Sequence, residues 1–413
     1  MAVPLRVLAV GSVYPPHFLG GYEIIWRGAM AHLRDEGHLA RILTTDYRRA
    51  DVAPGTGEDP DVHRELDWYW REHEWRSLGP RAVLRLERHN MAVLDRHLAD
   101  FRPDVITWWP VGGMSLGLIE RARRSGVPAL FFVLDPWLWY GPERDRWMRM
   151  WAHLGPGAAL AERITGLPAR VDYDIAGRWV FCSRTMREES LAAGLRPVES
   201  TILSPGVERS YLDAAREREP PPWRWRLLYV GRVVEQKGVA TAIEALALLP
   251  ASATLRIVGE GDPSYRAELE RLATRLGVSG QVTFTPQQAR DQMHGVFRAS
   301  DAVLFPVQWD EPWGLIPLEA MALGRPVLAT GRGGSGEYLI HDHNSLLFES
   351  RSPTGLAAAA RRLAGDPELR ERLRRGGYAT AARHSEDAFN RDALAEMLAV
   401  AGRAPSAPGA PTR

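Results

Sequence analysis

The sequence predicts an α/β protein with two doubly wound parallel-sheet domains in tandem. Short apolar runs alternate with longer amphipathic segments along most of the chain, a pattern typical of βαβ units. A charged stretch over residues 211–222 interrupts the alternation once and ends in three prolines, which can continue neither a helix nor a central strand. We therefore expect one domain on each side of this stretch, and a chain of 413 residues is long enough for both.

The first half supplies the strands and helices of the first domain. In its first amphipathic segment, Ile25, Ala29 and Leu33 form an apolar stripe with helical spacing. The expected strands are residues 5–10, 40–43, 105–108, 128–134 and 201–203, and the expected helices are residues 22–36, 81–100 and 115–124. Residues 48–80 carry no readable pattern.

The second half repeats the alternation more regularly. The expected strands are residues 227–230, 253–258, 282–284, 302–305 and 326–329. The expected helices are residues 239–249, 264–276, 288–298, 316–323, 354–365, 367–384 and 388–400. We place the first domain at residues 1–207, a linker at 208–222, the second domain at 223–385, a terminal helix at 386–402 and a disordered tail at 403–413.

Composition narrows the class of protein. A net charge of +1 does not favour a nucleic-acid partner, and we expect none. Cys182 is the single cysteine, which rules out an intramolecular disulfide and suits a reducing compartment. Residues 1–10 read as a first strand rather than a secretory signal, and no apolar run is long enough for a membrane span. We expect a cytoplasmic protein, which leaves room for peripheral contact with a membrane.

The loop after strand 227–230 carries the strongest chemical signal. Gly231 allows a turn at the strand end, and Arg232 and Lys237 follow it five positions apart. Lys237 is the only lysine among 52 basic residues, which favours a role that needs a compact ammonium. Two cations here could bind one diphosphate and stabilise a leaving group. The alternative is two solvated surface charges.

A second signal lies between strand 302–305 and the next helix. Pro317 suits the first turn of that helix, so backbone N–H groups around Gly314, Leu315 and Ile316 would face an anion. Glu311 precedes the helix and Glu319 falls within it, and carboxylates accept hydrogen bonds from sugar hydroxyls. The alternative is one capping and one solvated glutamate.

A weaker signal follows the first strand. Gly20 and Gly21 precede the first helix and permit close approach of the backbone to a phosphate. Neither a dinucleotide-binding G-x-G-x-x-G nor a P-loop is present.

Together these motifs resemble the family 4 retaining glycosyltransferases, whose GT-B fold has two Rossmann-like domains facing across a cleft. The resemblance covers nearly the whole chain and rests on the order and spacing of several short elements. These are G-R-x-x-x-x-K-G at 231–238, E-x7-E at 311–319, V-G-E-G at 258–261, G-R-P-V at 324–327 and the glycine pair at 333–334.

The resemblance implies a donor, an acceptor and a set of roles. The donor is a nucleoside diphosphate sugar, and the acceptor is a small molecule, a glycan or a lipid-linked molecule bound mainly by the first domain. Arg232 and Lys237 grip the diphosphate, Glu319 holds the ribose and Glu311 holds sugar hydroxyls. The remaining donor contacts implied are Gly20, Gly21, Gly261, Pro286, Gly314, Leu315 and Ile316. The last helix crosses back to the first domain.

One position departs from the family. Many members carry His-Asp after the strand at 129–133, whereas this chain has Leu134-Asp135, which removes the usual histidine contact to the donor sugar. Asp135 remains a candidate catalytic residue, with a turn-capping role as the alternative.

Aromatic residues provide the acceptor candidates. Of 15 tryptophans, Trp108, Trp137 and Trp139 follow strand ends and could stack on a sugar or an apolar acceptor. Core packing is the alternative for tryptophans in general. His17 and Tyr22, in and after the first strand-to-helix loop, complete the expected acceptor set.

We expect a hexosyltransferase that retains anomeric configuration and needs no metal or cofactor. His17 is the best candidate base for an inverting reaction, and Asp135 is the next. Asp172/Asp174 and His341/His343 have ligand-like spacing but poor context for a metal. The alternatives are a nucleotide-sugar epimerase of the same fold, a phosphorylase with a Lys237 Schiff base, and a non-catalytic binding subunit.

Overall fold

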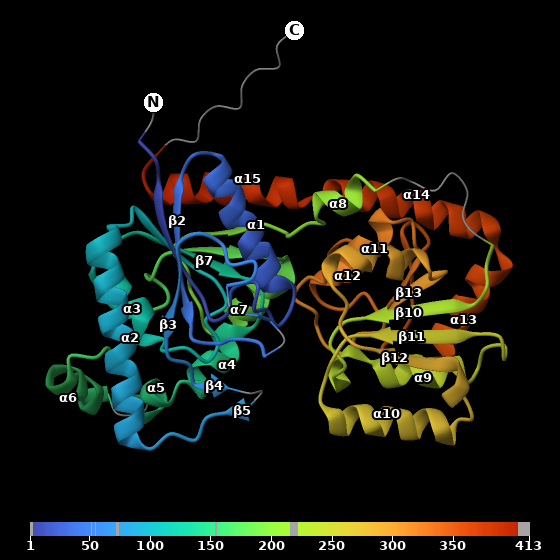
Figure 1. Cartoon of the computed structure of the whole chain (residues 1–413), viewed down its shortest axis with the longest axis horizontal. Coiled ribbons are helices and arrows are strands. Elements are labelled where there is room, and N and C mark those ends of the chain that lie inside the picture. Colours follow the sequence, from blue (N-terminus) through green and yellow to red (C-terminus); the bar gives the residue numbers. More distant parts are fainter. Residues whose placement is uncertain are drawn as a thin grey trace, which may run out of the picture. The chain divides into compact units, whose positions relative to one another are not determined.

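The computed structural model describes residues 3–403 except for residues 51, 54, 72–73, 153–154 and 215–221. The chain divides into two compact units, one formed by Met1–Leu203 with Phe389–Arg413 and the other by Ser204–Ala388. Each unit is built on a parallel sheet flanked by helices, which confirms the expected pair of doubly wound α/β domains (Figure 1). No helix in the described part of the chain is long and apolar enough to span a membrane.

The first unit contains a seven-stranded sheet with the order β3-β2-β1-β6-β7-β8-β9. Its strands are β1 (Arg6–Val10), β2 (Leu39–Thr45), β3 (Val62–Leu66), β6 (Val105–Trp108), β7 (Ala129–Val133), β8 (Arg178–Phe181) and β9 (Ser200–Ile202). Its helices are α1 (Gly21–Asp35), α2 (Pro80–Phe101), α3 (Gly117–Arg124), α4 (Trp137–Arg144), α5 (Arg146–Trp151), α6 (Gly155–Thr165) and α7 (Arg184–Ala192). A small antiparallel pair, β4 (Trp70–Arg71) and β5 (Glu74–Trp75), lies before α2.

The second unit contains a six-stranded sheet with the order β12-β11-β10-β13-β14-β15. Its strands are β10 (Arg226–Val230), β11 (Thr254–Val258), β12 (Val282–Thr285), β13 (Ala302–Phe305), β14 (Val327–Ala329) and β15 (Ser345–Leu347). Its helices are α8 (Arg209–Leu212), α9 (Val239–Leu246), α10 (Pro263–Arg275), α11 (Arg290–Arg298), α12 (Leu315–Ala322), α13 (Pro353–Gly365) and α14 (Pro367–Arg383), with single 3-10 turns η1 (Glu235–Lys237), η2 (Ser279–Gln281) and η3 (Gly334–Glu337).

The last helix, α15 (Glu386–Val400), contributes to the core of the first unit. Phe389, Ala393 and Met397 recur every four residues on one face, and all three are buried in the same apolar cluster as Val7 and Phe132. The expected return of the terminal helix to the first domain is therefore present.

Several elements were not expected from the sequence. β3 is an edge strand whose residues are mostly half-buried, so it shows no apolar run. α4 contains Pro142, and α5 has only six residues, so neither shows a sustained helical stripe. α6, α7, β8 and β15 were also missed.

The expected linker and tail are only partly described. Residues 209–212 of the linker form α8, and Tyr211 on this helix is buried rather than solvated. Residues 215–221 of the linker and residues 404–413 of the tail lie outside the described residues.

Candidate functional site

The site in the second unit lies where the strand order reverses. β10 pairs in parallel with β11 on one side and β13 on the other, so the connections after β10 and β13 leave the sheet in opposite directions. In open α/β sheets the carboxyl ends of such a strand pair form the ligand-binding crevice. The loops that follow these two strands are those that carry Arg232, Lys237 and Glu311.

Glycines bring the two loops together. Gly238 has φ +73° after η1, and a Cβ there would lie 1.9 Å from the carbonyl oxygen of Pro306, which follows β13. The backbone N–H of Gln308 also donates to the carbonyl of Gln236, at 2.8 Å. Only glycine allows this approach, which fixes Lys237 beside the loop after β13.

Lys237 and Glu311 form the centre of the site. The Nζ atom of Lys237 lies 2.6 Å from Oε2 of Glu311, and their side chains are only 13% and 11% exposed. The indole N–H of Trp309 donates to the same oxygen at 2.8 Å, and its ring centroid lies 5.5 Å from Nζ. The structure thus joins Lys237, expected to bind the diphosphate, and Glu311, expected to bind the sugar, in one charged pair. Sequence reasoning missed Trp309.

The backbone on either side of Glu311 is held by the glycine pair. Glu311 forms a bridge with Gly333, and the N–H of Gly334 donates to its carbonyl at 2.7 Å. A Cβ at Gly333 would lie 2.5 Å from the Glu311 nitrogen, so this contact requires glycine. The pair at 333–334 therefore positions Glu311.

The start of α12 follows Glu311 directly. Gly314 is its N-cap at φ +88°, and no side chain caps the helix. The first amide groups of a helix have no acceptor within it, so those of Leu315 and Ile316 can bind an anion. Pro317 occupies the first turn, as expected.

Glu319 belongs to a second buried ionic network. It is 2% exposed, and its Oε1 accepts a hydrogen bond from Arg290 Nη1 at 2.9 Å. Arg290, at the start of α11, also pairs with Glu208, and its guanidinium lies 5.6 Å from the ring centroid of Tyr211. Oε2 of Glu319 is buried and has no hydrogen-bond partner among the described residues. That oxygen therefore has an unmet capacity to accept a hydrogen bond.

Charge and burial act together in this network. Burial alone disfavours the charged form of Arg290, but Glu319, Tyr211 and Glu208 outweigh it and raise its pKa. Burial, with Glu319 nearby, raises the pKa of the Tyr211 hydroxyl. Arg290 and Glu208 were not expected from the sequence, because they are isolated charges that only the fold brings to Glu319.

The remaining donor candidates of this unit lie at strand ends. Arg232 is exposed, and its carbonyl accepts a hydrogen bond from the hydroxyl of Tyr229 at 2.7 Å. Gly261 bridges Val233 so closely that a Cβ would lie 1.9 Å from the Val233 carbonyl oxygen. Pro286 directly follows β12. The fold therefore puts Arg232 and Gly261 at the ends of neighbouring strands.

The first unit holds its own polar cluster at the start of α1. Gly20 is the N-cap, and its N–H donates to Oε2 of Glu23 at 3.0 Å. Gly21 begins the helix. The hydroxyl of Tyr22, the next residue, donates to the carbonyl of Phe132 on β7. Burial raises the pKa of the Glu23 carboxyl to about 7, although backbone donors oppose the shift. Sequence reasoning did not single out Glu23.

Asp135 follows β7, as expected. Its Oδ2 accepts a hydrogen bond from the hydroxyl of Tyr140 at 2.7 Å, and its charge contributes to the raised pKa of Glu23. Leu134 occupies the family's histidine position and packs against the apolar core of this unit.

The structure separates the acceptor candidates. Trp139 is 72% exposed, but Trp108 and Trp137 are 1% and 0% exposed. Trp108 stacks on Phe131 and Trp137 stacks on Trp179, so these two residues pack the core and their rings are not free to stack on an acceptor. This corrects the role expected for them. His17 is also buried, with Nδ1 accepting from the Arg49 N–H at 3.1 Å, and burial lowers its pKa.

Comparison with known proteins places this architecture in a family. Residues 213–380 match the family described as glycosyl transferases group 1. A glycogen synthase of Mycobacterium tuberculosis is 33% identical over 398 residues, covering 90% of this chain and 89% of that protein. A D-inositol 3-phosphate glycosyltransferase of Xylanimonas cellulosilytica is 34% identical over 180 residues, 43% of this chain and 42% of that protein.

Solved structures show the same GT-B fold at low identity. Anabaena Alr3699/HepE in complex with UDP and glucose has a TM-score of 0.67 and 20% identity, covering 96% of this chain and 99% of that one. Sucrose-phosphate synthase from Thermosynechococcus elongatus has a TM-score of 0.71 and 19% identity, covering 96% and 100%.

Proposed function

Because the chain belongs to the glycosyl transferases group 1 family, we propose that it transfers a hexosyl group from a nucleoside diphosphate sugar to an acceptor hydroxyl with retention of configuration. The observation that carries the proposal is the Lys237–Glu311 pair beside the start of α12, at the switch point of the second sheet. The structure of Anabaena HepE that shares this fold holds UDP and glucose, which makes UDP-glucose the first donor to test.

In this proposal the diphosphate binds at the cationic end of the site. Lys237 has three N–H donors, so it can bind phosphate oxygens while still donating to Glu311. Arg232 and the amides of Leu315 and Ile316 add positive charge at the same strand ends. Stabilisation of the leaving diphosphate at such a site lowers the barrier to breaking the bond from the sugar to the phosphate oxygen.

The carboxylates bind the sugars of the donor. The buried Oε2 of Glu319, which has no partner in the described part of the chain, accepts a ribose hydroxyl. Glu311 accepts hydroxyls of the transferred hexose. Each hydroxyl would donate to a charged, largely buried carboxylate, which favours sugars over deoxy analogues.

The reaction is a front-side substitution. The bond from C1 to the phosphate oxygen breaks with its electron pair going to the diphosphate, and the acceptor oxygen bonds to C1 on the same face. The departing phosphate takes the acceptor proton, so no protein base is required. His17 suits an inverting base poorly, because it is buried and its Nδ1 is occupied by a backbone N–H. Metal-independence and a cytoplasmic location are part of the same proposal.

The test is the configuration of the product. UDP-glucose and a panel of other nucleotide sugars are supplied with simple glycosides, and the new linkage is read from its NMR coupling constant. An α-linked donor should give an α-linked product, with activity kept in excess EDTA. A β-linked product would refute retention. Consumption of the donor to an epimer, or binding without turnover, would refute the transferase itself.

A further inference from the structure

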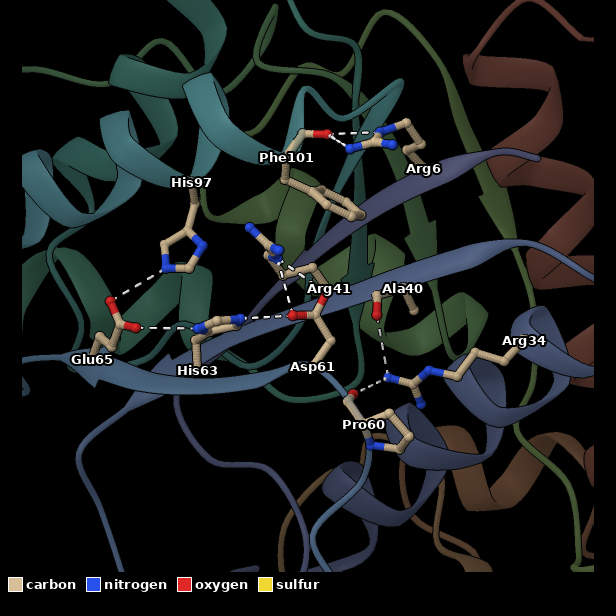
Figure 2. A network of polar contacts seen from close by, with 10 residues as sticks. All are labelled: Arg6, Arg34, Ala40, Arg41, Pro60, Asp61, His63, Glu65, His97 and Phe101. Carbon is tan, nitrogen blue, oxygen red and sulfur yellow. Dashed lines mark hydrogen bonds and ion pairs between the residues drawn. The ribbon is translucent and has the colours of Figure 1, made fainter. Parts of the chain in front are cut away.

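A cluster of histidine and carboxylate side chains lies between β3 and α2 in the first unit, outside the proposed donor site (Figure 2). His63 and Glu65 stand two positions apart on β3 and therefore on the same face of this edge strand. His97 reaches from α2 toward Glu65, as Figure 2 shows. In the described part of the chain these three residues form a group whose ligand atoms all lie within 4.8 Å of one another.

The distances between these atoms suit a tetrahedral metal site. Nδ1 of His63 lies 3.1 Å from Oε1 of Glu65, and Nε2 of His97 lies 3.3 Å from Oε2. Ligands at about 2.0–2.1 Å from a tetrahedral zinc ion are roughly 3.3 Å apart. A zinc ion could replace the two contacts once the Glu65 carboxylate turns to present one oxygen between the two imidazoles, and the fourth position would remain open to water.

The residues that surround the cluster also resemble those around a metal site. Nε2 of His63, on the side of the ring away from Glu65, lies 2.7 Å from Oδ1 of Asp61. A carboxylate at this position fixes the tautomer of a metal-binding histidine and raises its basicity. Arg41 pairs with the other oxygen of Asp61 at 3.0 Å and holds that carboxylate in place.

His97 supplies an independent observation. Its side chain is only 4% exposed, and its Nδ1 is buried with no hydrogen-bond partner among the described residues. Besides its edge-on packing against the His63 ring, this buried imidazole is held by a long polar contact to Glu65, which a metal ion can replace at little cost.

We propose that His63, Glu65 and His97 bind one Zn²⁺ or a similar borderline divalent ion, which fastens the edge strand β3 to α2. Two imidazoles and one carboxylate suit zinc, whereas Mg²⁺ prefers oxygen ligands only. The site is structural and separate from the proposed donor site, so it is compatible with metal-independent transfer.

Arg96 competes with the ion for Glu65. It forms an ion pair with Oε2 of Glu65, but its own side chain is 54% exposed. Zinc binding must displace this guanidinium into solvent, which costs about as much as a surface ion pair. Removing Arg96 should therefore strengthen zinc binding.

The test uses the full chain, purified without a polyhistidine tag, stripped with EDTA and dialysed. Calorimetry at pH 7 should find one Zn²⁺ per chain and no Mg²⁺, and Co²⁺ should give the intense visible absorption of a tetrahedral site. At a hundredfold excess of zinc over Kd, Tm should rise by about 5 °C. Failure of the wild type to bind Zn²⁺, or binding of Mg²⁺ at the same site, would overturn the proposal.

Variants locate the ion. His63→Gln, at a half-buried position, should abolish the Zn²⁺ heat and the Tm shift, whereas His343→Gln, an exposed histidine of the second unit, should leave both unchanged. Arg96→Met should tighten zinc binding roughly fivefold. Binding unchanged by His63→Gln, or weakened by Arg96→Met, would show that the ion binds elsewhere.

Discussion

Replacing Lys237 with methionine separates its role in binding from its role in the fold. The substitution keeps an unbranched side chain one atom shorter and removes the charge 2.6 Å from Glu311 Oε2. If Lys237 binds the diphosphate, the variant loses one charge-assisted hydrogen bond, worth about 1.5–3 kcal/mol. Nucleotide affinity should then fall by about 10- to 150-fold.

The same change also affects stability. Glu311 is left largely buried without its cation, although the indole N–H of Trp309 still donates to it at 2.8 Å. We expect the free energy of unfolding to fall by roughly 2 kcal/mol. Lys237→Met with Glu311→Gln removes the uncompensated charge, so the double variant should recover part of this stability without recovering nucleotide affinity.

Two measurements check the reasoning. Isothermal calorimetry with UDP gives the binding constant, and urea unfolding gives stability for wild type, both single variants and the double variant. Arg275→Met, an exposed arginine at the end of α10, is the matched control for loss of one positive charge. Unchanged UDP affinity in Lys237→Met would refute the assignment of the site. An equal loss in Arg275→Met would show that net charge, not position, is responsible.

Three further predictions concern other residues. Glu319→Ala should reduce the preference for UDP over its 2′,3′-dideoxyribose analogue at least tenfold, since the lost partner is a ribose hydroxyl; a preference unchanged in calorimetry would contradict the role of Glu319. Burial gives Glu23 a pKa of about 7 in the folded state, against 4.5 in the unfolded state. Its contribution to the free energy of unfolding, roughly 3 kcal/mol, is therefore fully present below pH 4.5 and is lost as the pH rises to about 7. Glu23→Gln should remove this part of the pH dependence of urea unfolding, and an unchanged profile would count against the prediction. Because Lys237 is the single lysine, an amine-reactive reagent should label the protein at Lys237 and at the N-terminus. If UDP covers the Lys237 ammonium, it should slow labelling of Lys237 at least tenfold. Equal labelling rates with and without UDP, measured by mass spectrometry, would oppose diphosphate binding at Lys237.

The sequence predicted the second unit better than the first for a physical reason. The buried strands β10, β11 and β13 are apolar runs next to regular helices, so periodicity locates them. Their loops contain Gly231, Gly238 and Gly314 at positive φ, positions at which glycine is visible in the sequence. The motifs and the sheet order together therefore place Lys237 and Glu311 at one edge.

The site and core residues that the sequence did not predict are set by contacts between residues far apart in the chain. Glu208, Arg290 and Glu319 form one network across 111 residues of sequence, and none of the three belongs to a local pattern with the others. The burial of Trp108 and Trp137 shows the same limit, because a position at or after a strand end does not reveal whether the ring turns into the core or toward solvent. His63 and His97 likewise meet only when β3 packs on α2.

The charged residues of the candidate site in the second unit fit the chemistry of the proposed donor. Lys237 and Glu311 neutralise each other while both are largely desolvated, and Arg290 pairs with both Glu208 and Glu319 and so offsets one of their two negative charges. A nucleoside diphosphate sugar carries anionic oxygens for the ammonium and hydroxyl donors for the carboxylates. Each group can therefore gain a ligand partner without leaving the other uncompensated, which avoids the cost of a buried, isolated charge. A site that holds its charges in this way before binding needs little reorganisation when the diphosphate departs, and that preorganisation is what stabilises a developing negative charge.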